Sequence, residues 1–419
     1  MLPEVDRVMA DVPVPGAAVA VLRDGVPVHA RGYGLANLEW QAPVGTDTVF
    51  RLASLTKSFT ATAILLLEGD GRLQLDDRLG DHLPEYPAPG RDVTLRQLLQ
   101  HTAGIPNYTA LPNFYERFAR EDRTPEGLFA LFADLPLDFA PGTDFRYSNS
   151  GYSLLGAVIE ARSGMPYADF VRERIFKPLG MADSRYLENE PVIPRRADGY
   201  RRVVGGFAHA PYLSMALPYS AGALGSTLDD LMRRDAALRR GELVDVATQA
   251  RMATPLVLTD GLELGYGLGW RLGRYRGQRV QHHAGGINGF STFTARFLEG
   301  DPLTVIVLTN LDNFDAAGLT RHLVEALLGN RPVPATATAK LDGSPFAGSY
   351  LAMGALVTVT SVAGGLDLRS PALNTRLVPV GEATFRAADD GDTEVRFHGR
   401  HMVLERPFNW VLAQRADLA

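Results

Sequence analysis

Hydrophobic positions alternate with polar ones at both ends of a long first part of the chain. The stretch "AAVAVLRDGVPVHARGYG" predicts two strands that meet at Asp24-Gly25, a pair that tolerates the positive φ angles of a tight hairpin turn. Strand patterns return far downstream in "YGLGWRL", "QRVQHHA", "FSTFTARFL" and the wholly apolar "LTVIVLTN". We therefore expect one sheet that is assembled from both ends of a single domain.

The region between about residues 60 and 265 has mainly helical spacing, and we expect it to be inserted between the two halves of the sheet. Residues 55–68, "LTKSFTATAILLLE", are apolar on nearly every side, which is typical of a helix buried all round. The segments "SLLGAVIEARSG" and "ADFVRERIFKPLG" predict further helices that end near glycine, and "DAAGLTRHLVEALLG" predicts one after the last strand.

A domain boundary is indicated by the Pro/Ala/Thr-rich tract "GNRPVPATATAKLDGSP", which has no apolar period. After this tract, alternation resumes around Gly364-Gly365 and again around His398-Gly399, a pattern typical of antiparallel strands. We predict a first domain over residues 1–331, a linker over 332–343 and a small antiparallel β domain over 344–419.

Composition narrows the possible functions. The chain of 419 residues has no cysteine, which excludes disulfides, thiolate metal sites and cysteine nucleophiles. A net charge of -6 offers no basic surface for a nucleic acid, and no apolar run reaches the length of a membrane span. The N-terminus lacks a cationic start and an apolar core, so we expect a cytoplasmic protein if the chain is complete, and a periplasmic or secreted one if a signal peptide was removed.

Lysine is rare, and one of the three lysines lies inside the predicted buried helix, at Lys57. Ser54 precedes it by three positions, so the two side chains are expected on one face of the helix start. A lysine acts as a general base only when neutral, and burial lowers its pKa in that direction. Ser54 and Lys57 are therefore candidates for a nucleophile and its base, although a serine and a lysine at this spacing also occur by chance.

Two further strings contain groups that could complete such a site. Tyr147 and Asn149 in "FRYSNSGYS" offer a phenol for proton transfer and an amide for a substrate carbonyl, although both also suit the start of the following helix. His283 in "QHHAGGINGF" is expected at the end of a strand, and Gly285 and Gly286 would let a ligand lie against the backbone of an edge strand. No metal-binding pattern and no GxSxG elbow accompanies them.

These strings, in this order, resemble the serine β-lactamase and penicillin-binding protein superfamily, and most closely its class C-like branch. That branch includes class C β-lactamases, family VIII carboxylesterases, D-amino-acid-specific amidases and alkaline D-peptidases. The segments "TVFRLASLTKSFTATAI", "TLRQLLQHTAGIPNY", "FKPLGMADS" and "YGLGW" resemble the branch as well, so the likeness covers roughly residues 10 to 330.

The resemblance implies a fold and a set of roles. The fold class is α/β (α+β), with a mostly antiparallel sheet flanked by helices, beside a helical region and followed by a lipocalin-like β module. Ser54 would be the acylated nucleophile, and Lys57 with Tyr147 would carry its proton to the leaving group. Asn149 would contact Lys57 and the substrate carbonyl, and the Ser54 and Gly286 N–H groups would form the oxyanion hole. His283 takes the place of the lysine of the third motif, and no cofactor or metal is implied.

The histidine at position 283 is the most informative departure from the branch, because it is mostly uncharged near neutral pH. We therefore expect an esterase or amidase for small-molecule esters, amides or short peptides, with weak or no β-lactamase activity. A D-amino-acid peptidase, a DD-carboxypeptidase and a β-lactamase remain alternatives; the peptidases would need an ionic partner in the cleft, such as Glu263, Asp229 or Arg296. A ligand sensor or scaffold on the same fold is the alternative of another class.

Two other residues are given structural interpretations. His101 in "LLQHTAGIPNY" is expected to support a turn near the cleft, because the base is already supplied by Lys57. Trp270 in "YGLGW" is expected in the core. The oligomeric state is not indicated by any pattern in the sequence.

Overall fold

The computed structural model describes residues 2–329, 341–352 and 354–416. Its main sheet combines both ends of the first domain, as predicted, and is antiparallel throughout. The strand order is β11-β12-β13-β14-β1-β2-β3, so the N-terminal hairpin pairs with the last strand of the downstream set. The bounds are β1 (Gly16–Arg23), β2 (Val26–Asn37), β3 (Ala42–Pro43), β11 (Arg271–Tyr275), β12 (Gln278–Ile287), β13 (Phe290–Phe297) and β14 (Leu303–Thr309).

The hairpin turn at Asp24-Gly25 is confirmed. Asp24 has φ 50° and Gly25 has φ 74°, the positive values that a turn of this kind needs at both central residues. Beyond the turn, Val19 pairs with Arg31 on one side and with Val307 on the other, so β1 lies in the interior of the sheet. Its residues from Gly16 to Leu22 are all buried, which explains why this part of the sequence is apolar without alternation.

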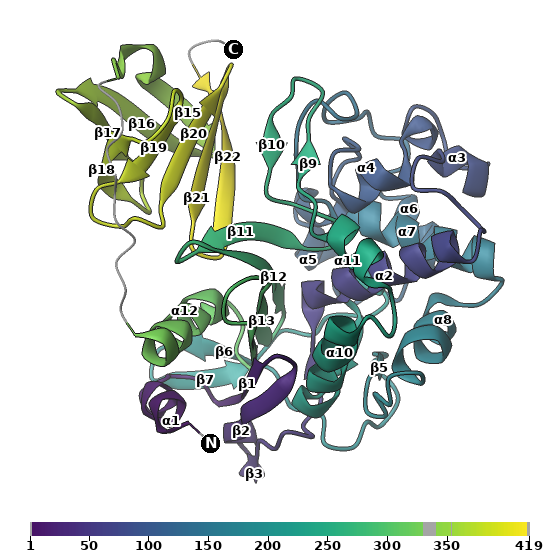
Figure 1. Cartoon of the computed structure of the whole chain (residues 1–419). Coiled ribbons are helices and arrows are strands. Elements are labelled where there is room, and N and C mark those ends of the chain that lie inside the picture. Colours follow the sequence, from purple (N-terminus) through teal and green to yellow (C-terminus); the bar gives the residue numbers. More distant parts are fainter. Residues whose placement is uncertain (1, 330–340, 353, 417–419) are drawn as a thin grey trace.

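Helices cover both faces of the sheet (Figure 1). One face packs against α1 (Pro3–Ala10) and α12 (Ala316–Leu328), whose apolar side chains join a cluster with Val19, Val305 and Phe293. The other face packs against α10 (Leu228–Arg240) and a short 3-10 turn, η1 (Ala53–Leu55). The nucleophile candidate Ser54 therefore lies directly on the sheet.

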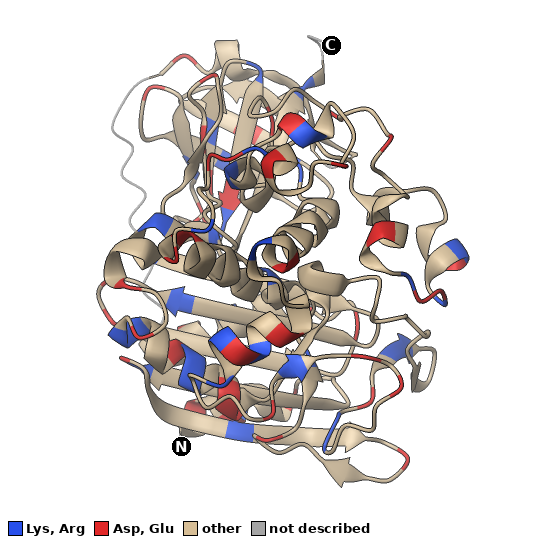
Figure 2. Cartoon of the chain, turned by 90° about the vertical axis from the view of Figure 1, so that its right-hand side faces the viewer, with Lys and Arg blue, Asp and Glu red and all other residues tan. Residues whose placement is uncertain are grey.

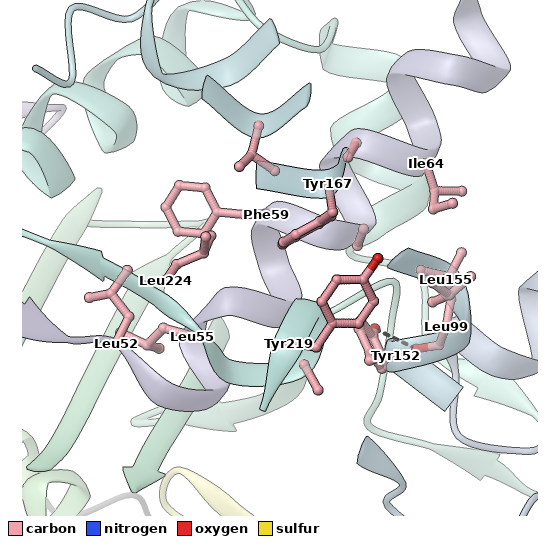
Figure 3. Close-up of a cluster of buried hydrophobic side chains, with 14 of the residues drawn as sticks. Leu52, Leu55, Phe59, Ile64, Leu99, Tyr152, Leu155, Tyr167, Tyr219 and Leu224 are labelled. Carbon is pink, nitrogen blue, oxygen red and sulfur yellow. Dashed lines mark hydrogen bonds between the residues drawn. The ribbon is translucent and has the colours of Figure 1, made fainter. Parts of the chain in front are cut away.

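The inserted region is mainly helical and centres on α2 (Thr56–Gly69), which is buried nearly all round, as its composition predicted. α2 packs against α7 (Asn149–Ser163) and α9 (Tyr219–Gly222) through the apolar cluster shown in Figure 3. The other helices are α3 (Leu79–His82), α4 (Leu95–Leu99), α5 (Phe114–Phe118), α6 (Pro125–Phe129), α8 (Tyr167–Val171) and α11 (Val246–Met252).

Short strand pairs brace the connections of this region. The three-stranded sheet contains β4 (Phe50–Arg51), β8 (Leu224–Ser226) and β5 (Arg185–Tyr186). Two separate hairpins are also present in this region, β6 (Tyr200–Val203) with β7 (Gly206–His209) and β9 (Leu256–Val257) with β10 (Glu263–Leu264). Figure 2 shows acidic and basic residues interspersed over the helices and strands of one side of the molecule.

The C-terminal module is a closed barrel of antiparallel strands, which fits the expected small β domain. Most of the predicted linker, 332–343, lies outside the described residues. The barrel strands are β15 (Gly348–Ala352), β16 (Ala355–Val362), β17 (Gly365–Arg369), β18 (Asn374–Pro379), β19 (Thr384–Ala387), β20 (Glu394–His398), β21 (His401–Arg406) and β22 (Asn409–Arg415).

The barrel is anchored to the main sheet by the turn between β21 and β22. Phe408 in this turn has φ 59° and lies in the apolar cluster of the sheet, with its ring centroid 5.0 Å from that of Tyr275 and 5.5 Å from that of Phe293. Trp410 packs against Phe145 and donates its indole N–H to the Gly265 carbonyl at 2.6 Å. The two aromatic residues thus hold the hairpin against the edge of the sheet at β11 (Figure 1).

Replacing Phe408 with alanine should loosen this anchor. Removal of a buried phenylalanine costs about 3 kcal/mol or more of folding free energy, and we expect that loss in chemical denaturation of Phe408→Ala. The exposed Leu356 on β16 offers a control, because Leu356→Ala removes an apolar side chain of the same module that is 53% exposed. An equal loss of stability in the two variants would contradict the anchoring role of Phe408.

Candidate active site

Ser54 lies in the middle of η1, at the entrance to α2. The preceding residue, Ala53, has φ 50°, a left-handed conformation that costs a residue with a side chain free energy. Neighbouring contacts hold this turn in place, since the Thr292 hydroxyl donates to the Leu52 carbonyl at 2.9 Å. The sheet therefore fixes the backbone that presents the Ser54 hydroxyl.

Gly285 on β12 allows this turn to approach the sheet closely. A Cβ atom at Gly285 would lie 2.3 Å from the Leu52 carbonyl oxygen and 2.3 Å from the Thr292 hydroxyl oxygen, both inside van der Waals contact. At Gly286 the same atom would meet nothing within 4 Å, and Gly286 lines the cleft beside Ser54. The two glycines therefore have different tasks: Gly285 admits the turn, and Gly286 leaves room for a ligand.

Lys57 is fully buried, and its ammonium nitrogen has three oxygen neighbours. Nζ lies 3.2 Å from Ser54 Oγ, 2.7 Å from Asn149 Oδ1 and 2.9 Å from the Ala221 carbonyl oxygen. Burial lowers the pKa of Lys57 well below its ordinary value. In its neutral form, the amine can donate its two hydrogens to Asn149 and Ala221, which leaves its lone pair to accept the Ser54 proton.

Tyr147 lies against Lys57, whose Nζ is 4.7 Å from the centre of the phenol ring. Burial raises the pKa of Tyr147, and the nearby Ser54 hydroxyl opposes this only partly. The phenol therefore stays protonated at neutral pH, so Lys57 and not Tyr147 is the group suited to accept a proton at rest. Its hydroxyl is buried without a hydrogen-bond partner among the described residues, and the residue lines a cavity next to the barrel instead of the cleft beside Ser54.

Asn149 is the first residue of α7, and Ser148 caps this helix by accepting the Gly151 N–H. The capping function that the sequence left open thus belongs to Ser148, and the Asn149 side chain turns toward Lys57. Asn149 Nδ2 also donates to the Thr109 hydroxyl at 3.1 Å, which leaves one N–H for a substrate.

His283 lies in the middle of β12 and not at the end of a strand, which corrects the sequence prediction. The pattern failed because the strand continues through Gly285 and Gly286, which pair with Thr292 and Ser291 on β13. β11 pairs with β12 only as far as His282, so the last part of β12 has a free edge, as predicted. His283 is fully buried and does not line the cleft.

A directed chain of hydrogen bonds connects His283 with His101 through Tyr266. The Ser148 N–H donates to His101 Nδ1 at 3.1 Å, so the neutral His101 carries its proton on Nε2 and donates to the Tyr266 oxygen at 2.9 Å. The Tyr266 hydroxyl then donates to His283 Nε2 at 3.2 Å, and His283 Nδ1–H donates to the Ala284 carbonyl at 2.7 Å.

Both histidines in this chain are neutral. Burial lowers the pKa of His283 to about 3 and lowers the pKa of His101 well below its ordinary value. His101 thus supports the turn before α7, as expected, and Trp270 is buried in the core. The sequence patterns did not predict a role for Tyr266, the first residue of "YGLGW". Its position in that segment was the one signal that could have indicated that it lies near the site.

The cleft beside Ser54 is small and uncharged. Its volume is about 60 Å³, and none of the described residues that line it has a charged side chain. Aromatic and aliphatic groups dominate, including Tyr108, Phe114, Leu213, Leu217 and Ile287.

The three ionic candidates lie elsewhere. Glu263 lines a cavity that includes barrel residues, Asp229 accepts from the Thr46 hydroxyl, and Arg296 is buried in an ion pair with Asp235. Across the described ranges, no cluster of three metal-ligating side chains is found, and no helix there is long and apolar enough to cross a bilayer.

Comparison with known proteins agrees with this architecture. Residues 4–328 match the family model described as Beta-lactamase. Penicillin-binding protein 4* of Bacillus subtilis is 32% identical over 314 residues, which cover 70% of this chain and 67% of that protein. The chain therefore belongs to the beta-lactamase family of serine hydrolases.

Two solved structures show how far the likeness extends. The octameric penicillin-binding protein homologue from Pyrococcus abyssi superposes with a TM-score of 0.67 at 25% identity, covering 98% of both chains. The D-amino acid amidase from Ochrobactrum anthropi gives a TM-score of 0.68 at 25% identity over 78% of this chain and 98% of that one. The predicted fold class is confirmed.

Lys57→Ala should abolish acylation. We expect kcat/KM for a p-nitrophenyl ester to fall by about 10³-fold or more, because the variant lacks the base that accepts the Ser54 proton. Lys177→Ala is the matched control, since Lys177 is an exposed lysine paired with Glu173. Circular dichroism checks that both variants are folded, and a folded Lys57→Ala with nearly normal turnover would refute the assignment.

The two glycines of β12 should respond differently to alanine. Gly285→Ala forces the Ser54 turn off the sheet, so we expect a loss of about 1–3 kcal/mol of stability together with slower acylation. Gly286→Ala fits without a clash and should leave stability within about 0.5 kcal/mol, while the added methyl group impairs turnover. Thermal unfolding and ester kinetics measure both effects; equal destabilisation would be inconsistent with the packing described.

Proposed function

We propose that the protein cleaves esters and amides of small, uncharged acyl groups through an acyl-enzyme on Ser54, with weak or no β-lactamase activity. The observation that carries this proposal is the uncharged lining of the cleft around Ser54. A carboxylate or an ammonium on the acyl part would lose its hydration there without gaining an ionic partner. Neutral acyl groups that contact Phe114, Leu213 and Ile287 avoid that cost.

The chemistry begins with proton transfer from Ser54 to Lys57. As Ser54 Oγ bonds to the acyl carbon, its proton passes to Lys57 Nζ, and the carbonyl oxygen becomes an oxyanion. The N–H groups of Ser54 and Gly286 are the proposed donors to that oxyanion. When the bond to the leaving group breaks, Tyr147 donates its proton and is reprotonated from Lys57. Water then takes the place of the leaving group and attacks the acyl-enzyme ester, and the acylation steps run in reverse. The proton of the water passes to Tyr147, whose own proton moves to Lys57 and then back to Ser54 Oγ as the acid is released.

Burial of His283 supports the proposed preference against β-lactams and peptide C-termini. A cation at this position of the third motif would attract a substrate carboxylate, whereas His283 is neutral and accepts a hydrogen bond from Tyr266. The site therefore recognises a substrate through its acyl carbonyl and apolar contacts.

D-amino-acid amides and peptides are the second candidate substrates. The similarity to a D-amino acid amidase favours them, and they require the same acyl-enzyme chemistry. A free α-ammonium would, however, need a carboxylate that the described cleft residues do not supply. A sensor or scaffold role is disfavoured by the buried Lys57, because binding alone does not require an amine whose lone pair is directed at a serine.

A substrate panel should separate these possibilities. We expect kcat/KM to be highest for short-chain or aromatic p-nitrophenyl esters, lower for D-aminoacyl p-nitroanilides and lowest for nitrocefin, because only the first group is uncharged in the cleft. Fluorophosphonate labelling followed by mass spectrometry should place the acyl adduct on Ser54.

Ser54→Ala serves as the control for background hydrolysis in each assay. Faster turnover of nitrocefin than of the esters would refute the proposal, and preferential release of D-alanine from a model peptide would favour the carboxypeptidase. Labelling of Ser54 without turnover of any substrate in the panel would instead favour a sensor.

A further inference from the structure

A cavity of about 380 Å³ lies between the main sheet, α12 and the barrel. His282 contributes to its wall from β12, and because neighbouring residues of a strand point to opposite faces, this wall is on the other side of the sheet from His283. Arg271 from β11, Arg321 from α12 and Arg406 from the end of β21 line the same cavity. Three elements that are distant in sequence thus each contribute an arginine to the lining of one cavity.

These arginines have few acidic partners. Arg406 forms no ion pair with any described carboxylate, and the Arg271 guanidinium contacts Trp410, donating to its carbonyl at 3.4 Å and lying 5.3 Å from the centre of its ring. Arg321 Nε forms a long ion pair with Glu325 of the same helix, at 3.8 Å, and has no hydrogen-bond partner among the described residues. The Arg321 side chain as a whole is 40% exposed, but its Nε is buried, and a buried N–H donor without an acceptor is rare because its lost hydration is not replaced.

The carboxylate that does line the cavity is already in use. Asp315 accepts the Gly318 N–H at 2.8 Å and thereby caps α12. Its charge is balanced by the positive end of that helix, so the guanidinium groups outnumber the free carboxylates around the cavity.

His282 supplies a second, independent indication. The residue is 1% exposed, and its Nδ1 has no hydrogen-bond partner within the described part of the chain. The ring is stacked against Phe293, with centroids 5.6 Å apart, which fixes its orientation. A buried imidazole nitrogen without a partner loses about 1–3 kcal/mol relative to a satisfied one, and an oxyanion in the cavity could accept its N–H.

We propose that this cavity binds a small organic anion with at least two negative charges, carried by phosphate or carboxylate groups. The planar guanidinium group matches both kinds of oxyanion through paired N–H donors. The volume is that of a site for a small organic molecule, not for a single phosphate ion. Such a ligand would connect Arg406 of the barrel with Arg271 and Arg321 of the hydrolase domain, and would therefore strengthen the docking of the two.

The test is thermal unfolding of the full chain in the presence of citrate or inorganic phosphate, with sodium chloride adjusted to hold ionic strength constant. We expect the unfolding temperature to rise and reach a plateau, at lower concentration for citrate than for phosphate, because binding to the folded state alone stabilises it. Arg406→Gln should raise the half-saturating concentration by about tenfold, since one charge-assisted interaction is lost.

Arg369→Gln is the matched control, because Arg369 is an exposed arginine at the end of β17 and lies outside the cavity. If Arg406→Gln weakens the barrel itself, Arg321→Gln tests the same site from α12. An unfolding temperature that rises without a plateau, and equally in all variants, would show a general salt effect and overturn the proposal. The proposal would also be overturned if the half-saturating concentration were the same in Arg406→Gln, Arg321→Gln and the unchanged protein. Because the experiment measures stability and not turnover, its outcome does not bear on the proposed substrate of Ser54.

Discussion

Burial of the Lys57 amine is the physical constraint on which the rest of the site depends. An amine is expensive to bury as an ammonium, so burial lowers the pKa of Lys57 well below its ordinary value and favours the neutral form. The same burial requires oxygen atoms around the nitrogen, which Asn149 and Ala221 provide from two different helices. The packing of α2 against α7 and α9 therefore forms the core of the domain and also creates the environment that would let Lys57 act as the proposed base.

At rest, the groups around Ser54 are uncharged. Burial favours the neutral form of Lys57, Tyr147 is protonated, and the hydrogen bonds through Tyr266 hold His101 and His283 in their neutral tautomers. In the proposed mechanism, charge appears when the serine proton moves, as an ammonium and an oxyanion close together. Donors that are fixed in advance stabilise that pair more than the resting state, which is the condition for catalysis.

Local sequence patterns were sufficient to predict much of this arrangement. The Asp24-Gly25 turn, the buried helix and the contact between Ser54 and Lys57 all depend on residues a few positions apart, where spacing fixes geometry. The contacts of Tyr266 could not be predicted, because they join residues 165 and 17 positions away. The extent of β12 beyond His283 is likewise determined by its pairing with β13. The sequence did not predict this extension, because Gly285 and Gly286 are not typical of the interior of a strand.

The seating of Phe408 among side chains of the main sheet also orders events during synthesis. Phe408 packs against Phe293 and Tyr275, yet it emerges from the ribosome more than a hundred residues later. Until then, the face of the sheet that it covers is exposed to water or to other nascent chains. This part of the core of the hydrolase domain is thus completed only after the β21–β22 hairpin has been made, so the sheet depends on the barrel for the last step of its folding.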